Sequence, residues 1–598
     1  MINDCLTAMT RGPLRRLRNL LLVFWAASLV LPLPAGAATA PLETIYLYSS
    51  PLTKAFFAAN GSNYDTLTAR WNVYLKTYGK AYREITRAQL LKGLPRGVLV
   101  LGSAALLDSD ERRAIQNFID DGGSIIATWA TGVRDGKGKW HGYSFIETTF
   151  DLKVTGRDEI SSNERFLNTF GDSPLTWPVP AGERIFLGMV AESPLRIDSR
   201  QLAGRYFNWS RYPADKAKSG AIAYSEKNGS RRVFLGFSES SWEYDERLEL
   251  PKALDGVFAW LRREPRIFKG AWPDGDLSAQ LLEMDTEHKY ANAVNFARDL
   301  EAAGLRGTFY SLTSIAVDHK DIARALQEKH ELAYHAELHV GFKGKAPEAQ
   351  ESRIKKMVDD MTSIVGSRAL ARVTGFRAPT ESWDANTEIL LRKYGVRHHV
   401  ADPASSDARV PQFSQSEPGV GSADAIVVLP RTQLDDLNYQ AMKLSTEQAS
   451  ELIARDFDYL HEAGALGVLS VHSQNYAPEG LMAKLTPPYL KRLQEHRSDV
   501  WVAPGGEIAD WWRARARVVQ KMVPRGAMRA LEFTVQAPGD VTGVSFFVTH
   551  PAADAMPKAI KPRDPNMPKP ELRRIDAFRS VLIFPRLPAG SFAYDVEF

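Results

Sequence analysis

The middle of the chain alternates short apolar runs with stretches whose apolar residues recur at helical spacing. Such runs, separated by amphipathic helices, are typical of parallel strands joined by helical crossovers. Their number between residues 267 and 517 predicts a central (β/α) barrel of seven to eight strands. The expected strands are residues 281–284, 307–310, 331–334, 373–376, 397–401, 426–429, 467–471 and 500–503.

The preceding region, residues 42–266, shows a similar alternation. One helix is well marked, because Asp108 can cap its first turn and Gly122, which follows it, can adopt the left-handed conformation that ends a helix. Strands alternating with helices predict a doubly wound α/β domain with a parallel sheet. The expected strands are residues 44–47, 97–101, 124–127 and 232–236, and the expected helices are residues 109–121 and 250–263.

The last region, residues 524–598, has short apolar runs separated by turn-rich stretches and no helical pattern. This texture predicts a small antiparallel β domain, β-sandwich-like, in which residues 557–574 form a basic, solvated loop. The expected strands are residues 531–535, 544–549, 580–583 and 592–598.

Residues 1–37 have the pattern of a secretory signal peptide. Four arginines precede an apolar stretch at residues 20–33, and Ala35-Gly36-Ala37 offers small residues for cleavage. An uncleaved membrane anchor is the alternative, but the apolar stretch is short for a spanning helix. We therefore expect a periplasmic or secreted protein without a membrane span in the mature chain.

Removal of this segment changes the chemistry that the chain can offer. The formal net charge of +4 falls to about +1, so the composition does not indicate a nucleic-acid partner. The single cysteine, Cys5, is removed as well, which excludes disulfides and thiol catalysis in the mature protein.

Reactive side chains follow several of the expected barrel strands directly. Barrel enzymes carry their chemistry at the carboxyl ends of the strands, where such side chains meet at one rim. Two histidines four residues apart and a carboxylate can hold a zinc ion or a similar divalent ion and leave a position open for water. A second carboxylate can serve as a general base, an arginine can orient it, and a further histidine can act as an acid. The residues are Asp285, Glu287, His335, His339, Arg377 and His472.

These motifs resemble those of the NodB-type polysaccharide deacetylases, a carbohydrate esterase superfamily. The chain has Asp285-Thr286-Glu287, His335-x-x-x-His339, Arg377-Ala378-Pro379 and Leu469-Ser470-Val471-His472, in the family's order. The resemblance implies that Asp285 is the base, oriented by Arg377, and that His472 is the acid. It also implies that Glu287, His335 and His339 hold the metal ion.

The chain departs from the family pattern at Thr286, which stands where a second aspartate is common, so the ligand role of Glu287 depends on the acid-x-acid spacing. For the aspartate that tunes the catalytic histidine, Asp402 is the first candidate and Asp436 the alternative. Trp383 and Tyr290 are candidates for lining a sugar subsite, with ordinary packing as the alternative.

The first region resembles the glutamine-amidotransferase-like fold in Val98-Leu99-Val100-Leu101-Gly102 and in residues 118–126. That family's enzymes use a cysteine nucleophile, which the mature chain lacks, so the resemblance implies a non-catalytic domain. Its aromatic residues Trp129, Trp140 and Tyr143, with His141, form either a sugar platform or half-buried packing.

The leading hypothesis is an exported, metal-dependent enzyme that removes N-acetyl groups from an amino-sugar polysaccharide of an exopolysaccharide, capsule or cell wall. Proteins of exopolysaccharide assembly are possible partners on this hypothesis. Two alternatives remain open: a hydrolase of small amides or O-acetyl esters, and a non-catalytic polysaccharide-binding or scaffold protein.

Overall fold

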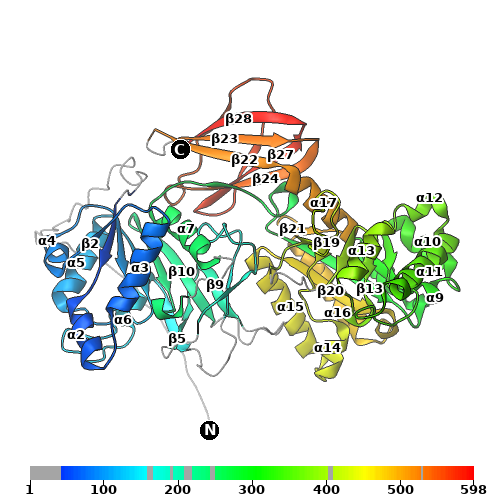
Figure 1. Cartoon of the computed structure of the whole chain (residues 1–598), viewed down its shortest axis with the longest axis horizontal. Helices are drawn as coiled ribbons and strands as arrows, with labels where there is room; N and C mark the ends of the chain where they lie inside the picture. Colours follow the sequence, from blue (N-terminus) through cyan, green and yellow to red (C-terminus); the bar gives the residue numbers. More distant parts are fainter. Residues whose placement is uncertain are drawn as a thin grey trace, which may run out of the picture.

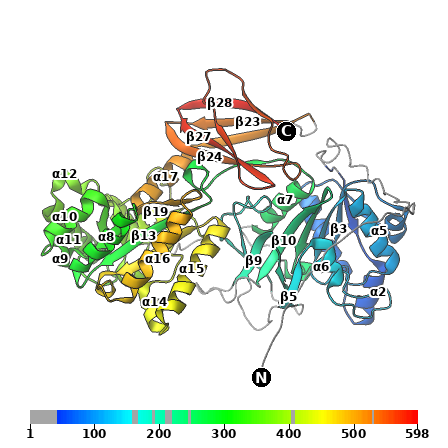
Figure 2. The ribbon, with the colours of Figure 1, turned by 180° about the vertical axis from the view of Figure 1, so that it is seen from behind.

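The computed structural model describes residues 42, 44–157, 166–188, 193–207, 219–242, 249–401, 408–526 and 530–598. The predicted signal peptide at residues 1–37 lies outside the described residues. The chain forms three units, and Figures 1 and 2 show the first (blue to cyan) and the second (green to yellow) side by side, with the third (orange to red) lying across both.

The first unit contains an 11-stranded sheet that is parallel in one half and antiparallel in the other. The parallel half confirms the expected α/β alternation, with strands β2 (Tyr82–Ile85), β1 (Ile45–Tyr48), β3 (Val98–Leu101), β4 (Ser124–Thr128) and β11 (Ser230–Leu235). The antiparallel half corrects the prediction of a wholly parallel domain. It consists of β10 (Gly220–Lys227), β9 (Leu202–Phe207), β6 (Phe166–Thr169) and β7 (Arg184–Phe186), with β5 (Lys153–Arg157) and β8 (Leu195–Asp198) attached beside them.

Helices cover both faces of the parallel half, as in doubly wound folds. The α5 helix begins where the sequence predicts, because the Asp108 carboxylate accepts hydrogen bonds from the backbone N–H groups of Asp110 and Glu111. One apolar cluster joins the sheet to α3 (Asp65–Thr77) and α7 (Glu249–Leu261). The opposite cluster joins the sheet to α4 (Arg87–Lys92), α5 (Ser109–Asp120) and α6 (Ser144–Phe150), and α2 (Pro51–Ala59) follows β1.

The second unit contains all eight expected strands in one curved sheet. They are parallel and run in the order β19 (Val427–Leu429), β17 (His398–Val400), β16 (Gly375–Arg377), β15 (Glu331–Tyr334), β14 (Thr308–Ser311), β13 (Ser278–Thr286) and β20 (Leu466–His472). The eighth, β21 (Val500–Val502), pairs with the start of β13, and the short β18 (Gln412–Phe413) pairs antiparallel with β19.

The strand ladder of this sheet stops short of closure, so the predicted barrel is a curled, open one. Among the described strands, the main path ends at β18, which flanks β19, and at β20, and β19 is not paired with β20. Thr432, which follows β19, bridges the opening instead: its hydroxyl donates to the Leu466 carbonyl and accepts from the Val468 N–H. A side chain thus replaces a strand pairing at this seam.

Helices pack on the outer face of this sheet, and one apolar cluster contains both. Residues of β13 alternate as the two-residue period of a strand requires: Leu282 and Met284 belong to this outer cluster, whereas Leu281 belongs to the inner one. The outer helices are α8 (Ala293–Ala302), α9 (Thr313–Ala316), α10 (Lys320–Lys329), α11 (Pro347–Val365), α12 (Ser367–Leu370), α13 (Ala385–Lys393), α14 (Asp436–Ala441), α15 (Thr446–Ala463) and α16 (Leu481–Glu495). The last helix, α17 (Gly505–Arg517), packs into the inner cluster instead.

The third unit is built of two four-stranded antiparallel sheets, as the sequence predicts for this region. Its two sheets face each other across a core that continues into the inner cluster of the second unit. One sheet contains β22 (Val519–Arg525), β23 (Ala530–Ala537), β28 (Gly590–Glu597) and β25 (Ala559–Pro562), and the other contains β12 (Ile267–Lys269), β24 (Val541–Thr549), β27 (Arg579–Leu587) and β26 (Glu571–Arg574).

Two details of this unit differ from the sequence prediction. The segment expected as a loop at residues 557–574 contributes β25 and β26 to the sheets. The prediction also assigned β12 to the barrel region, whereas this strand pairs with β24. The segment that links the first two units is therefore a strand of the third.

An aromatic stack joins the first unit to the third at this linker. Phe268 of β12 lies between Trp177 of the first unit and Phe547 of β24, with ring centroids 5.2 and 5.6 Å away and nearly parallel ring planes. The guanidinium group of Arg231, buried in the first unit, donates to the backbone carbonyl of His550 in the third. Buried contacts of this kind hold the units in one arrangement.

Within the described part of the chain, no helix combines the length and the apolar character needed to cross a membrane.

Truncation of Phe268 should destabilise the whole protein. Phe268 is 5% exposed and stacked on both sides, so Phe268→Ala leaves a cavity and should lower the free energy of unfolding by about 3–5 kcal/mol. Urea denaturation followed by tryptophan fluorescence measures the change. The control is Leu572→Ala on β26, whose side chain is 36% exposed. A Phe268→Ala protein as stable as this control would contradict the stacking role.

Candidate active site

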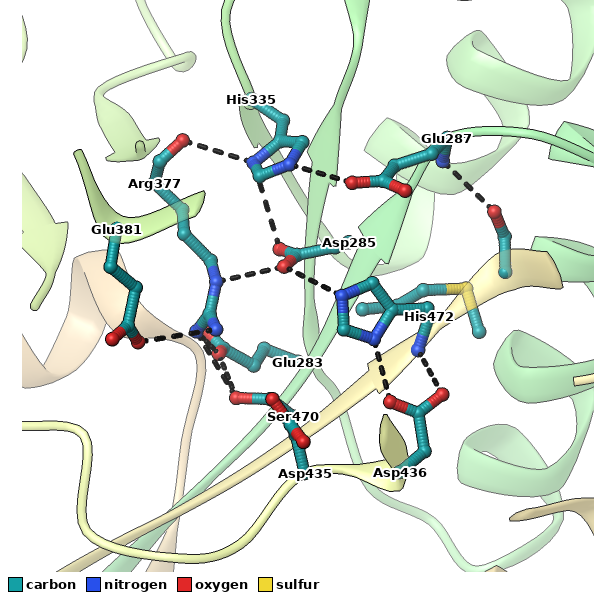
Figure 3. Close-up of polar contacts among 12 residues, drawn as sticks. Glu283, Asp285, Glu287, His335, Arg377, Glu381, Asp435, Asp436, Ser470 and His472 are labelled. Atoms are coloured by element: carbon teal, nitrogen blue, oxygen red, sulfur yellow. Dashed lines mark hydrogen bonds and ion pairs between the residues drawn. The ribbon is translucent and has the colours of Figure 1, made fainter. Parts of the chain in front are cut away.

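The carboxyl ends of the central strands deliver the predicted site residues to one rim (Figure 3). In the pairing of β13 with β20, Asp285 lies directly opposite His472. Arg377 is the last residue of β16, and His335 follows the last residue of β15. Because parallel strands end at the same edge of a sheet, four residues that are far apart in sequence become neighbours.

Glu287, His335 and His339 form a three-ligand cluster at this rim. The Nε2 atoms of both imidazoles lie 2.9 Å from the same oxygen, Glu287 Oε1. Burial alone would raise the pKa of Glu287, but the hydrogen bond and charge of His335 outweigh it and lower that pKa to about 2. Glu287 is therefore a carboxylate at neutral pH, which is the form that binds a metal ion.

The two histidines lie on a loop whose conformation is fixed by its surroundings. Ala336, between them, has a φ of 71°, a left-handed backbone that a residue with a Cβ rarely adopts. Arg353 of α11 secures the loop, because its guanidinium group pairs with the Glu337 carboxylate and donates to the Gly341 and Val340 carbonyls. The HxxxH spacing is thus satisfied by a braced loop and not by a helical turn.

Asp285 is 2% exposed and is held by the buried arginine. Its Oδ2 atom lies 2.8 Å from Nε of Arg377, and Arg377 Nη1 also pairs with Glu283, one strand period below Asp285. The Ser470 hydroxyl donates to Glu283 as well. One guanidinium group thus pairs with two buried carboxylates, and its Nε–H bond fixes the orientation of Asp285.

His472 has a buried carboxylate partner in Asp436. Its Nδ1 atom lies 2.6 Å from Asp436 Oδ1, and its backbone N–H donates to Asp436 Oδ2. Burial alone would lower the pKa of His472, but the hydrogen bond and charge of Asp436 raise it to about 9. The other ring nitrogen, Nε2, lies 3.6 Å from Asp285 Oδ2, so the acid and base candidates share one small volume.

The donor set fits a divalent metal ion. Nδ1 of His335 lies 3.0 Å from the Arg377 carbonyl, which cannot donate, so Nδ1 carries the proton and Nε2 offers its lone pair. Two imidazoles and one carboxylate are a ligand set of catalytic zinc sites that keep a position open. Asp285 Oδ1 is buried without a hydrogen-bond partner among the described residues, so it can accept a hydrogen bond from a water molecule.

Two predicted residues, Tyr290 and Trp383, lie away from this cluster. The ring of Tyr290 is 1% exposed, stacks on His319 and bonds to the Ser311 hydroxyl, so it cannot line a sugar subsite as predicted. Trp383 is half-buried and packs edge-on against His399. Asp402, the first candidate for tuning His472, lies outside the described residues, and the alternative Asp436 is the residue that bonds His472.

Sequence reasoning missed Glu283 and Gln474. Glu283 could have been predicted, because side chains two residues apart on a strand lie on the same face, and Glu283 precedes Asp285 by two residues. Gln474, whose amide donates to Glu287 Oε2 at 2.9 Å, has none, because it stands in a short turn that only the fold brings to Glu287.

The first unit has no comparable cluster of catalytic groups in its described part. Trp129, Trp140 and Tyr143 line a cavity of about 560 Å³ beyond the carboxyl ends of its parallel strands. His141 pairs with Asp135 instead.

Comparison with solved structures gives distant likenesses. The deacetylase Agd3, described as a novel carbohydrate deacetylase, is 12% identical, with 93% of this chain and 99% of that one covered and a TM-score of 0.40. A protein assigned as a polysaccharide deacetylase from Mycobacterium smegmatis is 20% identical, with 42% and 94% covered and a TM-score of 0.35. The Puue allantoinase is 16% identical, with 41% and 92% covered and a TM-score of 0.35. With TM-scores below 0.5, none of these likenesses bears on the function.

No protein with a curated description matches the chain in sequence. The family model of polysaccharide deacetylases matches residues 275–399. This segment contains Asp285, the three-ligand cluster and Arg377, whereas His472 and Asp436 come later in the chain. In residues 275–399, the first half of the second unit, the chain is therefore similar to polysaccharide deacetylases.

Proposed function

We propose that this protein is an exported, metal-dependent enzyme that hydrolyses N-acetyl groups of an amino-sugar polysaccharide. The observation that carries the proposal is the convergence at one rim of the three-ligand cluster, a buried carboxylate and a buried histidine. Glu287, His335 and His339 would hold a divalent ion, of which zinc suits the donor set best. When bound, that ion supplies Lewis acidity and lowers the pKa of water.

Asp285 is suited to take the proton from the attacking water. Arg377 holds its Oδ2 atom, which leaves the buried, unpartnered Oδ1 atom free to accept that proton. As the proton moves to Asp285, the water oxygen forms a bond to the acetamide carbonyl carbon. Arg377 remains paired with Glu283, below the rim, and keeps Asp285 in position during this step.

His472 is suited to protonate the departing amine. With a pKa of about 9, its imidazole carries a proton at neutral pH, and Asp436 fixes Nδ1 so that Nε2 faces the reaction volume. As the C–N bond breaks, Nε2 would give its proton to the sugar nitrogen, and acetate leaves with the water oxygen.

Exposed apolar side chains beside the cluster favour a carbohydrate substrate. His339 is 39% exposed, so the cluster opens to solvent on this side. Leu338 and Val340, on either side of it, are 53% and 49% exposed, and Leu437, next to Asp436, is 47% exposed. Exposed apolar groups around polar ones suit the mixed faces of sugar rings.

Acetate release from N-acetylated amino-sugar polymers is the direct test. The zinc-loaded protein should release acetate, and Asp285→Asn should lower kcat by about 10²–10⁴-fold because the base is lost. His335→Ala with His339→Ala should abolish turnover and the binding of zinc at the rim. His288→Ala, at an exposed neighbour outside the cluster, is the matched control and should retain full activity.

Other outcomes would favour the alternatives. Turnover of O-acetyl esters or small amides without polymer deacetylation would indicate a different substrate class. Polymer binding without any acetate release by the metal-loaded protein would indicate a binding protein. Recovery of the chain outside the cytoplasm with a new N-terminus near residue 38 tests export, and an intact N-terminus in the cytoplasm would contradict it.

Asp436→Asn should lower the pKa of His472, since the amide keeps a hydrogen-bonding group but loses the charge that favours imidazolium. The folded-state pKa of His472 is above the usual value of 6.5, so its charged form stabilises the fold at low pH. That contribution is complete below about pH 6.5 and is lost as the pH rises through about 9.

NMR titration of histidine-labelled protein measures this change, and His472→Gln identifies the resonance. The His472 pKa should fall by at least one unit in Asp436→Asn, and the alkaline limb of the kcat profile should move with it. Asp435→Asn, whose carboxylate pairs with Arg431, is the matched control. An unchanged His472 pKa in Asp436→Asn would show that Asp436 does not set it.

A further inference from the structure

A second cluster of potential metal ligands lies at the other end of the central sheet. It consists of His461, His496 and Asp499, whose ligand atoms all lie within 4.8 Å of one another. Ser278, which contacts this cluster, begins β13, whereas Asp285 lies near the carboxyl end of the same strand. At about 3.3 Å per residue the two ends are about 23 Å apart, so the clusters are separate sites.

The distances within this cluster suit a shared ion better than direct hydrogen bonds. Nε2 of His461 lies 3.4 Å from Asp499 Oδ2, and Nδ1 of His496 lies 3.5 Å from Asp499 Oδ1. Both exceed the usual range for N–H···O hydrogen bonds. Zinc ligands about 2.1 Å from a tetrahedral centre are about 3.4 Å from each other. Asp499 Oδ1 is also shielded from solvent without a hydrogen-bond partner in the described part of the chain.

A hydrogen bond behind His461 sets its ring as a metal ligand requires. Nδ1 of His461 lies 2.8 Å from the Ser278 hydroxyl, so Nδ1 has a partner and Nε2 faces Asp499. Metal-binding histidines usually have such a partner on the second nitrogen. The ring of Phe457 stacks flat on His461 and meets His496 edge-on, which restricts both imidazoles further.

The electrostatic surroundings also favour a cation here. His461 stands in the last turn of α15, and His496 is the C-cap residue of α16. Two helix carboxyl ends therefore meet at the cluster, and each presents the negative end of its dipole. All three side chains are partly exposed, at 17%, 33% and 33%, so an ion and a water ligand can reach them.

We propose that His461, His496 and Asp499 bind a structural divalent ion of the zinc type, independent of the ion at the rim. The ion would fasten together α15, α16 and the start of β21, which Asp499 precedes. The Asp499 carbonyl already accepts from the Leu277 N–H, so the start of β13 is fastened too. Residues at the amino-terminal end of barrel strands usually stabilise the fold, whereas the residues that carry the chemistry lie at the carboxyl end.

The α15 helix gives this site a wider structural effect. Its other side chains contact the first unit: Glu462 accepts two hydrogen bonds from Arg205 at 2.8 Å, and Tyr459 bonds to Asn168. An ion on His461 would therefore stiffen the helix against which the first unit docks. The proposal does not rest on the deacetylase function, because it uses none of the rim residues.

Metal analysis of the full-length protein and two ligand-deficient variants tests the proposal. Mass spectrometry of zinc-loaded, desalted wild-type protein should give two equivalents per chain. The rim variant, His335→Ala with His339→Ala, should keep one equivalent and still gain thermal stability when zinc is added. The basal variant, Asp499→Asn with His496→Gln, should lose one equivalent and retain acetate release if the rim is an active site. Glu495→Gln, at an exposed neighbouring position, is the control.

Cobalt substitution provides an independent measurement if the basal variant fails to fold. The rim variant loaded with Co²⁺ should show the visible absorption of a cobalt ion with nitrogen and oxygen ligands. Absence of metal from the rim variant, in both experiments, would overturn the basal site. Equal metal content in the wild-type and basal variants would overturn it as well. If the wild-type protein binds two metal ions but releases no acetate, the proposed function alone would be contradicted.

Discussion

The buried guanidinium group of Arg377 is the interaction on which the rim depends. Two carboxylates, Asp285 and Glu283, lie on the inward face of one strand, and both are almost completely shielded from water. Burial of two such groups without a cation would force protons onto them, because desolvation penalises the charged form. Burial does raise the pKa of Glu283, while Arg377 opposes the shift. The arginine also holds Asp285 as an oriented hydrogen-bond acceptor.

Strand alternation then explains why the other groups are where they are. Inward positions on β13 and β20 recur every second residue, so Glu283 and Asp285 face Ser470 and His472 across one pairing. The outward positions between them, Met284 and Val471, pack under the helices. A shift of one residue in this pairing would exchange the two sets and bury the apolar side chains in the reaction volume. The register of β13 with β20 therefore determines both the packing of the helices and the alignment of the site residues.

This dependence on periodicity shows what sequence can predict here. The apolar runs were sufficient to find the central strands, and the side chains that follow them gave Asp285, His335, Arg377 and His472, because strand ends and rim positions are local properties. The pairing of β12 with β24 joins residues about 280 positions apart, and no local pattern records it. The sequence named Asp436 only as the alternative to Asp402. Its bond to His472 required the fold, because Asp436 begins a helix that the turn after β19 brings to His472. Tyr290 was misassigned because an aromatic residue near a rim can point inward or outward.

The two ends of the central sheet have different surroundings. At the carboxyl end, His339 and its apolar neighbours are exposed, and loops there can change without disturbing a core. At the amino end, Trp512 of α17 and Trp272 belong to the cluster that continues into the third unit, and α15 meets the first. Both accessory units contact the end or the flank of the sheet that carries no rim residue. Their contacts can therefore brace β13 from its start while the rim at its other end stays open.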